Sequence, residues 1–129
     1  MKSPQLPLQI AVYSLLSQKI PYPVHDDFPQ EAPYPYVVTG DASAVDWSDK
    51  FKAGQGVSIT VHVWSQYRGR KEACEIIDLI IREISASTPD LAPDFNVVQG
   101  RLESSQLFMD IDGKTRHGVI TWKYLIEEL

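Results

Sequence analysis

The strongest constraint on the fold is a change of hydrophobic period near the middle of the chain. Residues 57–64 alternate strictly, with valine or isoleucine at every odd position, which is typical of a β-strand buried on one face. Residues 70–87 instead place apolar side chains at helical spacing from Ala73 to Ile84, and Pro89 follows. The sequence therefore predicts a strand followed directly by an amphipathic helix.

The N-terminal part predicts one more helix and one more strand. Apolar residues recur at helical spacing over residues 5–18, behind prolines that suit the beginning of a helix. Seven of the nine prolines precede residue 40, so residues 19–35 are predicted to form an extended connection. Residues 34–39 have the composition of a strand, whereas residues 41–56 show no clean period. We expect a mobile excursion over residues 41–56.

The C-terminal part predicts strands over residues 95–99, 103–111 and 119–126, the last two joined by a hairpin turn at residues 112–115. The order of elements does not alternate as in a parallel βαβ series. We therefore predict an α+β fold, with a mainly antiparallel sheet of four or five strands and two helices packed on one face. A chain of 129 residues predicts a single domain over residues 1–129.

Composition excludes several classes of protein. The formal net charge is −5, which disfavours a general nucleic-acid binder. No apolar run reaches the roughly 20 residues that span a bilayer, so no membrane partner is expected. The N-terminal residues match a signal peptide poorly and Cys74 cannot form an internal disulfide, so we expect synthesis and residence in a cytosol.

A search for reaction chemistry finds no catalytic motif. The sequence contains no phosphate-binding glycine loop and no Gly-x-Ser-x-Gly elbow, and the three histidines lack metal-site spacing. We therefore predict that the protein is not an enzyme and has no cofactor or metal. One alternative is a small hydrolase or toxin-like enzyme that pairs His62 or His117 with Asp110. Another is an adaptor that binds one host protein through its Pro/Tyr-rich connection.

Several short motifs point to a family. Residues 35–41 read PYVVTGD, and Asp46-Trp47 follows within a few positions. The predicted central strand ends at Trp64-Ser65, and residues 110–113 (DIDG) precede His117-Gly118. In these motifs and in the order of its elements, the chain resembles the tail-completion proteins of long-tailed bacteriophages and prophages, which are also described as tail terminators or head–tail joining proteins.

The resemblance implies a structural protein of the virion tail, assembled in the cytoplasm of a bacterial host. It would cap the head-proximal end of the tail as a homo-oligomeric ring, usually hexameric, between the tail tube protein and the head–tail connector protein. DNA would pass through the lumen without specific binding, which suits an acidic chain. We expect the isolated chain to be a monomer of 14.6 kDa that assembles only on a tail end.

The predicted contact region is the polar segment 40–56, because a loop anchored by a strand on either side can order on binding. Trp47 is its predicted apolar anchor, although folding back onto the core is an equally strong alternative for this side chain. The predicted protein-interface residues are Asp41, Asp46, Trp47, Asp49, Lys50 and Lys52.

Overall fold

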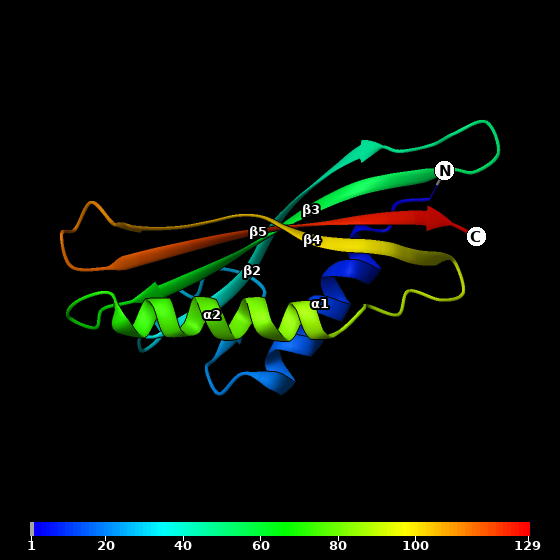
Figure 1. Cartoon of the computed structure of the whole chain (residues 1–129). Helices are drawn as coiled ribbons and strands as arrows, with labels where there is room; N and C mark the ends of the chain where they lie inside the picture. The colour runs from blue at the N-terminus through cyan, green and yellow to red at the C-terminus, as the bar shows by residue number, and fades with distance from the viewer. Residues whose placement is uncertain (1) are drawn as a thin grey trace.

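The computed structural model describes residues 2–129 as two helices and one five-stranded sheet (Figure 1). The elements are α1 (Gln5–Lys19), β1 (Val24–His25), β2 (Tyr36–Asp46), β3 (Gly54–Ser65), α2 (Lys71–Ala86), β4 (Phe95–Met109) and β5 (Arg116–Glu128). The strand order is β1-β2-β3-β5-β4, and every neighbouring pair is antiparallel except β1 with β2. The predicted α+β class and the mainly antiparallel sheet are confirmed.

The core follows the two hydrophobic periods in the sequence. Alternate residues of β3 and β5 are buried, and the apolar stripe of α2 packs against them. The same cluster contains three buried residues of α1. Its central members are Leu8, Val12, Leu16, Val57, Ile59, Val61, Val63, Ile76, Ile80, Ile84, Ile120, Trp122, Tyr124 and Ile126. Burial of this many large apolar side chains is the main stabilising term of the fold.

The excursion predicted over residues 41–56 is wrong. β2 continues to Asp46 and β3 begins at Gly54, so the two strands form one long hairpin whose loop covers only residues 47–53. The segment lacks an apolar period because residues 41–46 are exposed on both faces. Backbone pairing with β3 holds it extended instead, apart from a bulge between Gly40 and Ala42.

The break predicted between residues 99 and 103 is also wrong, because β4 is continuous. Two irregularities, Val97/Gln99 and Leu102/Ser104, each add a residue without ending the pairing with β5. Gly100 stays inside the strand because a Cβ atom there would lie 2.8 Å from the Tyr124 ring and 2.9 Å from Trp122 Nε1. The glycine therefore marks a close approach to two buried aromatic rings, not a turn.

The predicted connection begins after α1 ends at Lys19, and residues 20–35 contain no helix or strand other than the two residues of β1. β1 pairs in parallel with Val37 and Val38 of β2. The chain then places Phe28 within 6 Å of the rings of His62 and Trp64 on β3. Over residues 2–129, neither helix has the length and apolar character needed to cross a bilayer.

Candidate protein-binding site

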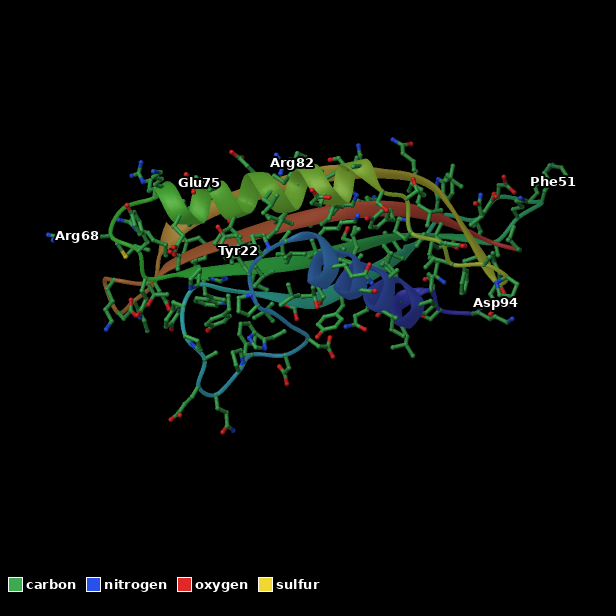
Figure 2. All side chains as sticks on the ribbon, turned by 90° about the horizontal axis from the view of Figure 1, so that it is seen from below. Tyr22, Phe51, Arg68, Glu75, Arg82 and Asp94 are labelled. Carbon is green, nitrogen blue, oxygen red and sulfur yellow. The ribbon has the colours of Figure 1, made fainter. Side chains whose placement is uncertain are left out.

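The loop of the β2–β3 hairpin forms one end of the molecule. Figure 2 shows Phe51 of this loop at one extremity and Arg68, which precedes α2, at the other. The loop is closed by backbone hydrogen bonds: the Trp47 amide donates to the Gly54 carbonyl (2.8 Å), and the Asp49 amide donates to the Lys52 carbonyl (2.9 Å). These bonds give the loop a defined shape before any partner binds.

Acidic side chains stabilise the turn from within. One oxygen of Asp49 accepts hydrogen bonds from the amides of Phe51 (2.7 Å) and Lys52 (2.8 Å), the arrangement by which aspartate favours turns. These two bonds, first that from Phe51, lower the pKa of Asp49. The Ser48 hydroxyl donates to Asp46 (2.6 Å) and accepts from the Gly54 amide (3.1 Å). Asp46 and Asp49 therefore shape the loop themselves.

A polar network connects the loop to the other strands. Lys52 Nζ lies 3.0 Å from Glu127 Oε2 on β5, and Asn96 of β4 donates to the other oxygen of Glu127 (2.9 Å). The hydrogen bond from Asn96, followed by that from Lys52, lowers the pKa of Glu127. Because these groups face water, we expect the ion pair to orient the loop more than it stabilises the fold.

Two aromatic side chains give the loop an apolar surface. Trp47 is 44% exposed and lies outside the core cluster, with its ring against Gly54. Phe51 is 89% exposed. A hollow of about 180 Å³ beside Trp47 is lined by Trp47, Ser48, Asp49, Lys52, Ala53, Gly54 and Glu127. Exposed aromatic rings beside such a hollow are typical of protein-binding surfaces.

The structure brings together five of the six predicted interface residues. Asp46, Trp47, Asp49, Lys50 and Lys52 lie in or beside this loop, and all are exposed. Asp41 instead lies at the bulge of β2, where its carboxylate is 3.9 Å from His62 Nε2. Phe51 was not among the predicted interface residues, although a phenylalanine in a polar turn was the available signal.

The histidines of the hydrolase alternative do meet, but within a stack of aromatic rings. His62 Nδ1 lies 2.8 Å from His117 Nε2, and the ring of Trp64 stacks on His117 with centroids 3.7 Å apart. Phe28 covers His62, and Phe108 contacts His117 edge-on. The stack links β3, β5, β4 and the connection after β1, so these histidines act as packing groups between strands.

Burial disfavours the charged form of both histidines. It lowers the pKa of His62, against a smaller opposing effect of Asp41. Burial and then the neighbouring His62 lower the pKa of His117, against a smaller opposing effect of Asp110. Asp110 itself accepts a hydrogen bond from the Ile111 amide in the β4–β5 turn (2.8 Å). The arrangement predicts a pH-dependent stability.

We expect the free energy of unfolding to fall as the pH is lowered from 7.5 to 5.5. Both folded pKa values lie below the unfolded value of about 6.5, so the unfolded chain binds more protons in this range. The stabilisation is complete above about pH 6.5 and is lost as the pH falls towards the pKa values of the two histidines in the folded state. Urea unfolding of the wild type and of a His62→Gln/His117→Gln variant measures it. Equal pH slopes for the two proteins would contradict the prediction.

These features define a class: an α+β protein with an ordered, exposed hairpin loop and with His62 and His117 packed in a stack of aromatic rings. Residues 9–127 match the family described as "Tail completion protein gp17". The tail completion protein gp17 of Bacillus phage SPP1 is 33% identical over 99 residues, which cover 75% of this chain and 71% of that protein. The chain therefore belongs to the gp17 family of phage tail completion proteins, and it is a structural protein, not an enzyme.

Two solved structures share the fold. A chain in the virion of a native gene transfer agent particle superposes with a TM-score of 0.80 at 20% identity, covering 93% of this chain and 94% of that chain. The structure of bacteriophage SPP1 gp17 superposes with a TM-score of 0.52 at 23% identity, covering 93% and 85%. The arrangement of elements is thus shared although few residues are.

Proposed function

We propose that this protein caps the head-proximal end of a long phage tail as a ring and joins the tail to the head connector. The observation that carries the proposal is the family match over residues 9–127. A joining protein needs no reaction chemistry. It needs one subunit interface that closes into a ring, one face for the tail tube protein and one for the connector protein.

The exposed groups suit this role. The hairpin loop at residues 47–53 projects from one end of the molecule and carries Trp47 and Phe51 (Figure 2). We propose the loop and the adjoining acidic residues as a contact to a neighbouring virion protein. The net charge of −5 favours a lumen through which DNA moves without binding. The ring would be hexameric, located in the virion tail and assembled in the cytoplasm of the bacterial host.

Deletion of the coding sequence tests the proposal. We expect infected cells to contain DNA-filled heads and separate tails, because each part assembles but the joint is missing. Electron microscopy counts joined particles, and a plasmid copy of the wild-type chain should restore them. An antibody label on an added epitope should mark the head-proximal tail end. Normal joined particles without the chain, or a label elsewhere on the virion, would contradict the proposal.

A further inference from the structure

The sheet has two free edges. β4 pairs with β5 on one side, and no strand within residues 2–129 pairs with its other side. At the opposite edge, β1 covers β2 only at Val37 and Val38. β2 beyond Gly40 therefore also has an unpaired side, although it continues to Asp46. Unpaired strand edges present backbone N–H and C=O groups that can pair with another chain.

Bulges and a few charged side chains give both edges some protection against pairing, but within residues 2–129 no other strand covers either edge over its full length. Edge strands are commonly blocked by lysine, proline or very short length. β2 carries only alanine, serine and valine between Asp41 and Asp46. β4 is the longest strand, with 15 residues, and is exposed over nearly all of them. Its exposed apolar side chains include Val98 and Leu102, and β2 exposes Val45.

The two edges lie at the same level of the sheet. Ala44 of β2 pairs with Val57, Val57 pairs with Tyr124, and Tyr124 pairs with Gly100 of β4. The free part of β2 is therefore level with the first half of β4. From β2 through β3 and β5 to β4 the strands alternate in direction. A second copy placed beside the first in the same orientation would therefore bring its β2 next to β4 of the first copy, with the two strands antiparallel.

A small cavity lies behind this half of β4. It has a volume of about 120 Å³ and is lined by Ile84, Ser85, Ser87 and Thr88 at and after the end of α2, by Val97, Val98, Gln99 and Gly100 of β4, and by Trp122 and Tyr124. The Trp122 Nε1 and Tyr124 hydroxyl groups are buried and have no hydrogen-bond partner within the described chain. This half of β4 is therefore backed by a hollow and not by a fully packed core.

We propose that residues 40–46 of one copy pair, as an antiparallel strand, with residues 97–105 of β4 in a second copy. The contact is head-to-tail, so repetition around an axis closes a ring or extends as an open helix. At the level defined by Ala44 and Gly100, Asp41 would lie diagonally beside Arg101, the only cation on β4, and opposite Glu103. This inference rests on the proposed ring and adds the surface that closes it.

Cysteine cross-linking in assembled tails tests the pairing. In a Cys74→Ser background, the variant Ala44→Cys/Gln99→Cys carries one thiol on each edge, and both sites are exposed. Treating purified tails with a short thiol cross-linker should give a ladder of covalent multimers on a denaturing gel. Each single variant should remain at 14.6 kDa, because one chain then supplies only one side of the contact. Ser43→Cys/Gln99→Cys provides a second pair if the first disturbs folding.

Controls separate this inference from the proposed function. Ala44→Cys/Glu75→Cys, whose second thiol lies on α2 (Figure 2), should give no ladder. Dimers from Gln99→Cys alone would reveal two-fold pairing of β4 with β4 and overturn the head-to-tail contact. Tails that contain the chain but give no ladder would also overturn it while leaving the proposed function intact. Absence of the chain from purified tails would reject both.

Discussion

Replacing Ile80 by alanine is expected to lower the free energy of unfolding by about 2–5 kcal/mol. Ile80 is fully buried in the middle of the α2 stripe, within the cluster that joins both helices to β3 and β5. The truncation removes apolar contacts and leaves a cavity that the sheet cannot fill by small shifts. Urea unfolding monitored by circular dichroism gives the difference from the wild type.

Ile10→Ala is the matched control for this change. Ile10 also lies in a helix, but its side chain is 55% exposed, so little apolar contact is lost. Alanine also has the higher helix propensity. We expect a change within about 0.5 kcal/mol of the wild type. If Ile80→Ala and Ile10→Ala lowered the free energy of unfolding by equal amounts, Ile80 of α2 would not have the central place in the core that the structure gives it.

The centre of the fold could be predicted because its hydrophobic periods are unambiguous. The alternation at residues 57–64 and the stripe of α2 each bury one face, and burial is what fixes these elements. The turn at residues 112–115 was predictable for a different reason. Asp112 accepts hydrogen bonds from the Thr115 hydroxyl, the Thr115 amide and the Lys114 amide, which lower its pKa to about 2, and Gly113 has a positive φ of 74°.

The extension of β2 over residues 41–46 and the continuity of β4 were not predictable in the same way. Residues 41–46 and most of β4 bury neither face, so pairing with a neighbouring strand determines their conformation and leaves no period in the sequence. Gly100 lies in the predicted break between residues 99 and 103, but its role depends on the rings of Trp122 and Tyr124, which lie more than twenty positions further along the chain. Such contacts are visible only once the fold is known.

The hairpin loop at residues 47–53 falls inside the segment predicted to make contacts, but its ordered form was not predicted. Its charged residues and Trp47 are in the sequence, but the ordered turn depends on the Asp49 carboxylate and on Glu127 at the far end of the chain. The meeting of His62 and His117 was likewise hidden, because the two residues are brought together by pairing of β3 with β5. The two histidines become neighbours only because β3 and β5 pair in the observed register.

Replacing Trp47 by alanine is expected to abolish the joining of heads to tails while leaving the folded monomer almost unchanged. Trp47 is half-exposed and outside the core cluster, so the free energy of unfolding should fall by about 1 kcal/mol at most. An aromatic side chain that becomes fully buried between proteins can instead contribute about 2 kcal/mol or more to binding. Electron microscopy of the mutant phage should show DNA-filled heads beside separate tails.

Trp122→Ala is the matched control, because the same residue type is removed from the core. Trp122 is 5% exposed, and its loss should cost about 3–5 kcal/mol of unfolding free energy. The two variants therefore separate stability from contact: we expect Trp122 to support the fold and Trp47 to support attachment to a neighbour. Normally joined particles from Trp47→Ala would exclude Trp47 as an anchor. A loss of stability equal to that of Trp122→Ala would show that Trp47 serves the fold of its own chain.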